Sequence, residues 1–242
     1  MFTKSTVGAY DYPTQHGRLV DIVEGPALRN FIRNGDFQIA QRGASFAGIT
    51  TAQYTLDGAQ TTGSSGTSTV SQQAFTVGQT AVPGNPINFL RVDRTVAAGV
   101  ANGVIQFPIE FPQRLSGKTV TFSFWAKVAS GTKAFTIDGV SSGVTPGAYP
   151  MLTSTGFTAT TTWTLFKFTS TIEAMTAATA NAAISPRIVE SASLGTFTLD
   201  IADVQLELGS EATYFKRLNY GDQLAWAQRF LPAIASLGTN RS

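Results

Sequence analysis

The stretch KTVTFSFWAK, residues 118–127, alternates apolar and polar side chains more cleanly than any other part of the chain. Successive side chains of a strand point to opposite faces of a sheet, so a period of two predicts a strand. This pattern therefore predicts a central strand with one strongly apolar face, made by Val120, Phe122, Phe124 and Ala126.

Short runs of the same kind continue on both sides of this strand, separated by Gly, Pro, Asn and Ser. In the run 163–172, Phe166, Phe168 and Ile172 share one face, while Trp163 and Leu165 lie on the other. Pro108 cannot donate a ladder hydrogen bond, so the run that contains it is predicted to be an edge strand or to carry a bulge. The further predicted strands are residues 70–77, 88–96, 103–111, 133–140 and 186–191.

The run FTLDIADVQLEL, residues 197–208, changes its register part-way along. Its first apolar residues have odd numbers and its later ones even numbers, so a regular strand would place them on opposite faces. A β-bulge near Ala202 and Asp203 would keep all of them facing the core. These core-facing residues are Leu199, Ile201, Val204, Leu206 and Leu208.

The remaining segments are read as loops, an arm and one helix. Residues 61–71 and 174–183 lack large apolar side chains and are predicted to be exposed loops. Residues 220–231 have helical periodicity, with Leu224, Ala227 and Leu231 on one face and Asp222 as N-cap, and Pro232 ends this helix.

The chain is therefore predicted to be all-β: a jelly-roll β-sandwich with an extended N-terminal arm and a short C-terminal helix. The arm covers residues 1–28, which have neither strand nor helix periodicity. The sandwich covers residues 29–218, and the C-terminal helix and tail cover residues 219–242.

Composition excludes several kinds of function. The net charge is +2 and the basic residues are scattered, so nucleic acid is not an implied partner. The chain has no cysteine and one histidine, His16 in the arm, which argues against zinc sites and Ser-His-Asp or Cys-His catalysis. No run of 18 apolar residues occurs, so membrane insertion is not expected.

Paired carboxylates for glycoside hydrolysis are the one catalytic alternative, because their separation cannot be read from a sequence. Unpaired surface acids are the favoured interpretation, and we expect no enzymatic activity. The acids concerned are Asp93, Glu110, Asp138, Glu190 and Asp200.

The stretch RNFIRNGDFQIAQRG, residues 29–43, combines a turn signal with an acid and several basic residues. Two interpretations are open. Asn34 and Gly35 supply a turn that starts the sandwich, with Asp36 hydrogen-bonding to backbone amides. Alternatively, a metal ion holds this turn.

Five short motifs, in this order, resemble a family of phage and prophage tail-fibre or spike segments that is related to jelly-roll carbohydrate-binding modules. The resemblance covers about residues 29–231, and Ala227 stands where that family often has a cysteine. The motifs are NFIRNGDFQ, RLSGKTVTFSFWAK, W.LFKFT, DIADVQLELG.EAT.F and QLAWAQRFL.

The resemblance implies a structural calcium ion held jointly by the first turn and the last strand. The matching positions are Asn34, Asp36 and Gln38 in the turn and Asp203 in the strand. Calcium prefers six to eight oxygen ligands, including carboxylates. Gln38 replaces the usual glutamate, which lowers the expected affinity. With or without calcium, the fold places Asp36 near Asp203.

Aromatic side chains are the candidate sugar-binding groups, because their faces stack on the apolar faces of sugar rings. Phe46, Tyr54 and Tyr149 lie in stretches predicted to be loops. Trp125, Trp163 and Trp226 lie on predicted strands or the helix, where packing is the usual role.

Taken together, the resemblance implies a non-enzymatic virion appendage protein, assembled in the host cytoplasm. Its arm would attach to other virion proteins, it would form a homotrimer, and its loops would contact a host cell-surface polysaccharide. Two alternatives are a structural capsid or tail connector without sugar binding, and a carbohydrate-binding module cut from a glycan-degrading enzyme. No cofactor is expected beyond the structural calcium.

Overall fold

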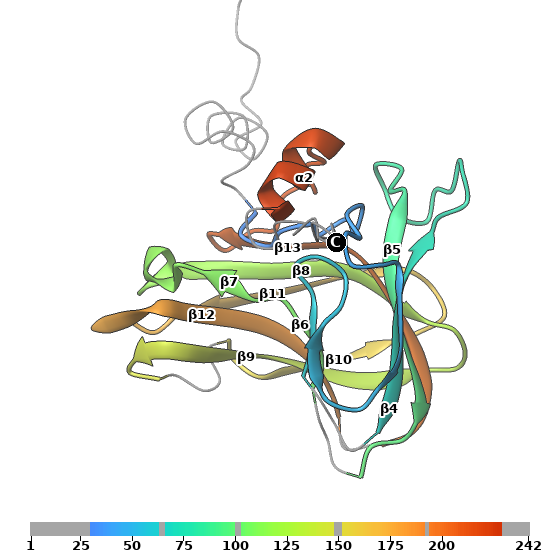
Figure 1. The fold of residues 1–242 in the computed structure, drawn as a ribbon, viewed down its shortest axis with the longest axis horizontal. Helices are drawn as coiled ribbons and strands as arrows, with labels where there is room; N and C mark the ends of the chain where they lie inside the picture. The colour runs from blue at the N-terminus through green and yellow to red at the C-terminus, as the bar shows by residue number, and fades with distance from the viewer. Residues whose placement is uncertain (1–29, 63–65, 100–102, 148–151, 192–193, 229–242) are drawn as a thin grey trace, which may run out of the picture.

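The computed structural model describes residues 30–62, 66–99, 103–147, 152–191 and 194–228, whose strands form two antiparallel sheets (Figure 1). In spatial order, the first sheet consists of β1 (Ser45–Ile49), β4 (Thr67–Ala74), β5 (Asn88–Val96), β13 (Phe197–Leu208), β8 (Thr119–Val128) and β11 (Thr164–Thr171). The second consists of β10 (Thr155–Ala159), β9 (Lys133–Thr145), β12 (Ala177–Glu190), β6 (Gly103–Gln106), β3 (Gln60–Thr62) and β2 (Ala52–Tyr54), with β7 (Ile109–Glu110) also paired to β12. The predicted jelly-roll sandwich is confirmed.

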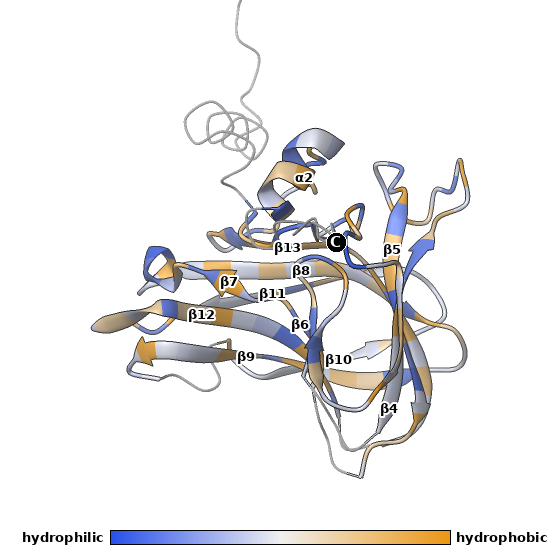
Figure 2. Cartoon of the chain, in the orientation of Figure 1, coloured by the Kyte–Doolittle hydropathy of each residue, from blue (hydrophilic) through white to orange (hydrophobic). Residues whose placement is uncertain are grey.

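The core lies between the two sheets, and β8 contributes its centre. Val120, Phe122, Phe124 and Ala126 are all fully buried, as the alternation of this strand predicts. Phe124 also contacts Phe157 of β10, with 5.5 Å between ring centroids, so one aromatic cluster joins the two sheets. Apolar and polar bands alternate along the strands in Figure 2, as expected for strands that bury one face.

β13 carries the predicted bulge. Its pairing with β8 shifts between Ala202 and Gln205, and Asp203 has a φ of 50°. The bulge keeps Leu199, Ile201, Val204 and Leu206 in the core, each fully buried. Leu208 is 46% exposed, so the prediction was wrong at the last residue of this strand.

Two segments predicted to be loops belong largely to strands. Residues 177–183 form the first half of β12, which pairs with β9 and β7 although its side chains are small. The segment 61–71 overlaps the end of β3 and the start of β4. Pro108 lies between β6 and β7, and β7 pairs with β12 alone among the described strands, so this part of the run is an edge, as predicted.

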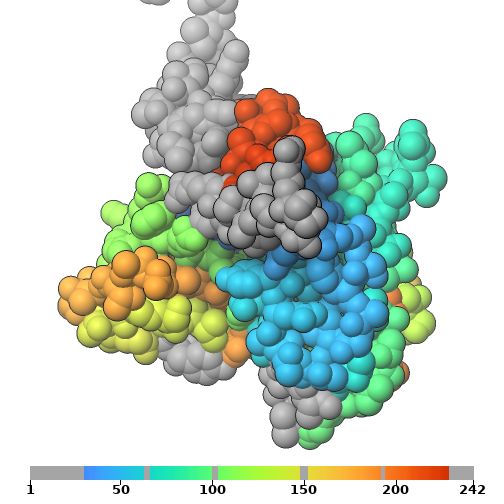
Figure 3. Space-filling view, viewed as in Figure 1, coloured from blue at the N-terminus to red at the C-terminus, as the bar shows by residue number. Residues whose placement is uncertain are grey.

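In the described part of the chain, a turn of 3-10 helix, η2 (Pro112–Leu115), precedes β8, and helix α2 (Tyr220–Gln228) follows β13 and lies at the surface of the molecule (Figure 3). Asn219, rather than Asp222, caps α2: its Oδ1 accepts the Asp222 amide at 2.9 Å, and its side chain donates to the Asp222 carboxylate at 2.6 Å. Neither helix reaches the length and apolar character needed to cross a bilayer, within the residues described. The predicted arm, residues 1–28, and the predicted helical residues 229–231 lie outside those residues.

Candidate functional site

The turn at residues 34–37, which we call the Asn34 turn, is held by the Asn34 side chain. Its amide nitrogen donates to the carbonyls of Ile39 and Asp57, both at 2.9 Å, and its oxygen accepts the Ile39 amide at 2.8 Å. Asn34 has a φ of 52°, a left-handed conformation that asparagine tolerates better than most residues. The sequence interpretation of Asn34 as a turn-forming residue is confirmed.

Gly35 docks this turn onto β13. The amide of Val204, next to the bulge, donates to the Gly35 carbonyl at 2.8 Å. A Cβ atom at position 35 would lie 2.0 Å from the Val204 carbonyl oxygen, so only glycine allows this approach. Glycine is therefore required at this position because the turn packs closely against β13. Val204 lies 169 residues after Gly35 in the sequence.

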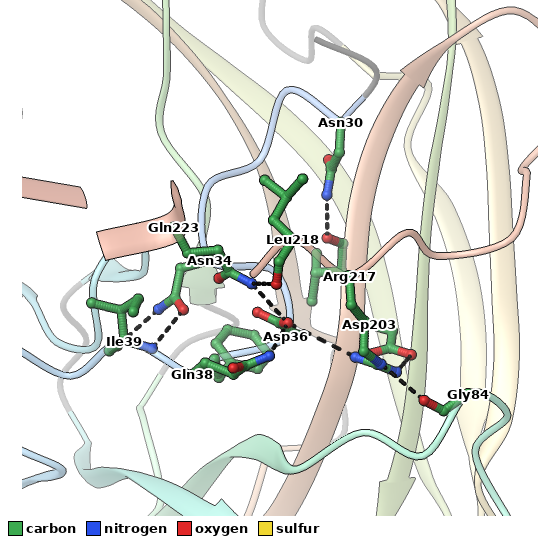
Figure 4. A network of polar contacts seen from close by, with 12 residues as sticks. Asn30, Asn34, Asp36, Gln38, Ile39, Gly84, Asp203, Arg217, Leu218 and Gln223 are labelled. Carbon is green, nitrogen blue, oxygen red and sulfur yellow. Dashed lines mark hydrogen bonds and ion pairs between the residues drawn. The ribbon is translucent and has the colours of Figure 1, made fainter. Parts of the chain in front are cut away.

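Asp36 and Asp203 meet at one arginine, Arg217, which follows β13 (Figure 4). The Arg217 guanidinium forms two hydrogen bonds with the Asp203 carboxylate, at 2.9 and 2.7 Å. One of its nitrogens also lies 3.9 Å from Asp36 Oδ2. The predicted proximity of Asp36 and Asp203 is therefore confirmed, with a cationic side chain between them.

Two glutamines complete the arrangement that we call the Arg217 cluster: Arg217, Asp36, Asp203, Gln38 and Gln223. Asp36 Oδ2 accepts a hydrogen bond from Gln38 Nε2 at 2.7 Å and another from Gln223 Nε2 of α2 at 3.0 Å. Both carboxylates are almost completely buried. Burial raises the pKa of Asp203 above its ordinary value of 3.8, whereas the hydrogen bonds and charge of Arg217 act in the opposite direction.

The residues implied for calcium do not fit that ion in this arrangement. Asn34 bonds to the backbone of Ile39 and of Asp57, and Gln38 presents its NH₂ group toward Asp36. Asp203 is engaged by Arg217. In the described residues, no three His, Cys, Asp or Glu side chains gather to hold a metal. The geometry favours the metal-free interpretation of the turn, except that Asp36 accepts from the side-chain amides of Gln38 and Gln223 rather than from the expected backbone amides.

The candidate sugar-binding aromatics lie in different environments. Tyr54 ends the edge strand β2 and is 45% exposed, with the Arg42 guanidinium 5.5 Å from its ring centroid. Phe46, on β1, is half-buried and packs against the core, so it is not a free platform. Both lie on strands rather than in the predicted loops. Tyr149 lies outside the described residues.

A row of polar side chains, which sequence reasoning missed, crosses the outer face of the second sheet and ends at Tyr54. The direct cross-strand partners are Asp138 with Arg187, Arg187 with Gln106, Gln106 with Gln60, and Gln60 with Tyr54. Directly opposed residues of antiparallel strands point to the same face. We call Asp138, Arg187, Gln106 and Gln60 the polar row.

Side-chain hydrogen bonds hold the polar row in place. Arg187 forms a two-nitrogen contact with the Asp138 carboxylate, with Nη2 at 2.8 Å from Oδ2. Gln106 Nε2 donates to Gln60 Oε1 at 2.6 Å. The residues next to the row, Ile137, Ile188 and Ile105, point into the core. The row is therefore a fixed set of hydrogen-bonding groups on the face of the sheet opposite the core, and its Arg187 and Asp138 side chains are 14% and 11% exposed.

A hollow of about 160 Å³ opens beside Tyr54. Asp57 in its wall is held by the amide and side chain of Gln41, both at 2.8 Å. Arg42 donates from Nη2 to the Thr55 carbonyl at 2.7 Å, but its buried Nε has no hydrogen-bond acceptor in the described part of the chain. A ligand oxygen could supply one. The hollow is lined by Arg33, Arg42, Tyr54, Asp57, Gly58, Glu110 and Ala227.

Comparison with known proteins finds similarity at the level of solved structures. No protein-family model matches the chain, and no curated protein matches it. A CBM4 carbohydrate-binding module matches at 16% identity over 74% of this chain and 99% of its own, with a TM-score of 0.41. A putative sugar-binding protein from Bacteroides thetaiotaomicron matches at 12% identity over 75% of this chain and 100% of its own, with a TM-score of 0.46.

A bacteriophage structure is also similar. The enzymatically active domain of tailspike protein 4 from bacteriophage CBA120 matches at 14% identity, with a TM-score of 0.43. The match covers 75% of this chain and 22% of the tailspike chain. These similarities concern the strand arrangement only, so a function for this chain has to be argued from its own residues.

Proposed function

We propose that this chain is a non-enzymatic, sugar-binding subunit of a phage appendage, and that the polar row with Tyr54 is its glycan site. The observation that carries the proposal is the unbroken cross-strand order from Asp138 to Tyr54. A sugar has hydroxyl groups around an apolar ring face. A line of donors and acceptors that ends at an exposed aromatic ring matches both properties.

The dimensions of the row suit an extended oligosaccharide. Adjacent strands lie ~4.8 Å apart, so four steps from Asp138 to Tyr54 span about 19 Å. The ligand that matches this length is a linear segment of a surface polysaccharide, lying across the strands. The hollow beside Tyr54 then receives the unit at one end, where the unpartnered Nε of Arg42 can donate to a sugar oxygen.

The state of the carboxylates near this site supports binding rather than hydrolysis. Of the three carboxylates near it, Asp138 is engaged by Arg187 and Asp57 by Gln41, so among the described residues Glu110 of the hollow has no uncommitted carboxylate beside it. A glycosidase needs two carboxyl groups that are free to serve as acid and as nucleophile or base. We therefore expect no release of shorter sugars when the protein is incubated with the polysaccharide that it binds.

Tyr54→Ala is expected to weaken binding to a glycan-array hit by about tenfold or more, because truncating an anchoring aromatic costs about 2 kcal/mol. The matched control is Tyr220→Ala, which removes another exposed tyrosine, 57% exposed, from helix α2. Isothermal titration calorimetry of both variants with the same oligosaccharide measures the effect. Equal affinities of the two variants would remove Tyr54 from the site, and no binding by the assembled wild-type protein would favour the structural-connector function.

The proposed attachment of this chain to a phage particle is supported by the sequence motifs that resemble tail-fibre and spike segments. Deleting residues 1–28 is expected to abolish incorporation of the protein into particles and to leave glycan binding intact. Gel analysis of purified particles and the same calorimetric titration measure the two properties separately. Light scattering tests the proposed homotrimer. Normal incorporation of the shortened chain would contradict attachment through the arm.

A further inference from the structure

A hollow of about 160 Å³, which we call the second hollow, opens on the outer face of the first sheet. Trp125 and Ser123 of β8 form its floor, and they alternate with core residues of that strand, so they point away from the core. The register places Leu165 of β11 opposite Trp125, and Gln205 of β13 opposite Ser123, on the same face. The polar row lies on the outer face of the other sheet, on the opposite side of the sandwich (Figure 1).

The segment between β13 and α2 forms one wall of the second hollow and is held at two points. Gln205 Nε2 donates to the Thr213 carbonyl at 2.7 Å, and Arg217 Nε donates to the Gly84 carbonyl at 3.0 Å. Between these points Tyr214 lies against the β4–β5 connection, because a Cβ atom at position 84 would be 2.3 Å from the Tyr214 hydroxyl oxygen. The Tyr214 ring is therefore positioned by the backbone at the rim of the hollow.

The lining of the second hollow combines ring and aliphatic surface with hydrogen-bonding groups. Trp125 is half-buried, while Tyr214 is 65% and Leu165 37% exposed. Ser123 contributes a hydroxyl, and Gln205, whose nitrogen is directed to the wall, contributes its amide oxygen. A purely apolar ligand would remove water from these two polar groups without replacing their hydrogen bonds. A sugar ring offers hydroxyl groups to them and an apolar face to the aromatic rings.

Charge and size narrow the ligand further. Asp203 is the one charged residue in the described lining, and Arg217 holds its carboxylate through two hydrogen bonds, at 2.9 and 2.7 Å. The second hollow therefore has no uncompensated charge to attract an ionic ligand. Its volume of about 160 Å³ is below the ~300–1,000 Å³ of pockets that enclose drug-sized ligands, so it accommodates a single ring.

We propose that the second hollow is a further sugar site, which takes one uncharged pyranose ring. The proposal deepens the sugar-binding function proposed above and rests on it for the class of ligand, but it uses none of the same residues. With the polar row on one side of the sandwich and the second hollow on the other, one subunit can contact two polysaccharide chains at once. Simultaneous contacts of this kind raise the overall strength of attachment.

The experiment follows the indole N–H signals of the full-length protein by NMR during titration with neutral methyl glycosides of glucose, galactose, mannose and N-acetylglucosamine. The chain has three tryptophans, of which Trp125 lines the second hollow, and none lines the hollow beside Tyr54. Trp125→Phe assigns the signal. We expect at least one of these sugars to shift the Trp125 signal in a saturable way.

Variants connect the shift to the second hollow. Tyr214→Ala is expected to weaken the sugar that shifts Trp125 by about tenfold or more, because it removes an aromatic wall. Ser123→Ala should weaken it as well, through the lost hydroxyl. The matched control is Tyr220→Ala, which removes a similarly exposed tyrosine from α2 and should leave the titration unchanged. Tyr54→Ala should also leave it unchanged.

Each result has a defined meaning. An unmoved Trp125 signal at about 50 mM of every sugar, far above the millimolar range of weak ligands, would overturn the second site. If light scattering showed that Tyr214→Ala separates an assembled oligomer, with no sugar response of Trp125, the occupant would be a second copy of the chain and the proposal would fail. A Trp125 shift without Tyr54-dependent binding would contradict only the polar row, and the reverse would contradict only the second hollow.

Discussion

Arg217→Met is expected to destabilise the protein by about 3–5 kcal/mol, because removing one partner of a buried ion pair leaves its charge uncompensated. Here two carboxylates lose their cation at once, and Asp203 is already penalised by burial. The loss also frees the segment after β13, since Arg217 anchors it to Gly84 as well. Urea unfolding of the variant and the wild type measures the difference.

This destabilisation should depend on pH. Burial raises the pKa of Asp203, and without Arg217 nothing in the cluster opposes that rise. The folded variant then binds a proton more tightly than the unfolded chain. Its stability is greatest below the unfolded pKa of about 4 and falls as the pH rises through the higher folded pKa.

The penalty relative to wild type is therefore expected to be larger at about pH 7 than at about pH 4. Unfolding curves of both proteins at the two pH values measure it. The control is Arg217→Met combined with Asp203→Asn, which removes the titrating group and should flatten the difference. A penalty that is equal at both pH values would contradict the role of Arg217 in lowering the pKa of Asp203.

Gly35→Ala is expected to cost about 3 kcal/mol or more of stability, or to prevent folding, because its methyl group would lie 2.0 Å from the Val204 carbonyl oxygen. Backbone atoms cannot move aside as the end of a flexible side chain can. Relief of the clash would break the hydrogen bond from the Val204 amide to Gly35 and separate the Asn34 turn from β13.

The matched control is Gly195→Ala. Nothing lies within 4 Å of a Cβ at position 195, and its backbone is not in the left-handed region, so this change should be nearly neutral. Thermal unfolding of the two variants makes the comparison. Equal stability of both would mean that the chain relaxes around position 35 at little cost.

Local alternation predicted the strands whose apolar faces are strong. The bounds of β5 and β13 were predicted to the residue, and β8 was shifted by one. The bulge in β13 could be predicted because its apolar residues change from odd to even positions at Asp203. In each case the signal is contained within one strand.

The first half of β12 was not predicted as a strand, because residues 177–183 are small or polar and do not alternate between apolar and polar side chains. They form a strand because β9 and β7 provide pairing partners, and those partners cannot be read from the segment itself. The polar row was missed for the same reason. Asp138, Arg187 and Gln106 become neighbours only through the register of three strands.

Arg217 was missed although a physical signal for it existed. Asp36 and Asp203 were expected to lie close together, and two adjacent buried carboxylates need a positive charge. A metal was considered for that charge, while an arginine 14 residues after Asp203 was not. The segment between β13 and α2 has no periodicity, so nothing in the pattern indicated that its side chains return to the sandwich.

The docking of Asn30 gives the domain a defined path for mechanical force. The Asn30 side chain donates to the Val204 carbonyl at 3.1 Å and accepts the Leu206 amide at 3.0 Å, and the Phe31 amide donates to the Leu206 carbonyl at 3.0 Å. A pull on the chain at residue 30 therefore acts on β13, which is paired with β5 on one side and β8 on the other. The load is shared across the middle of a six-stranded sheet instead of peeling an edge strand, which would suit the N-terminal attachment that we propose.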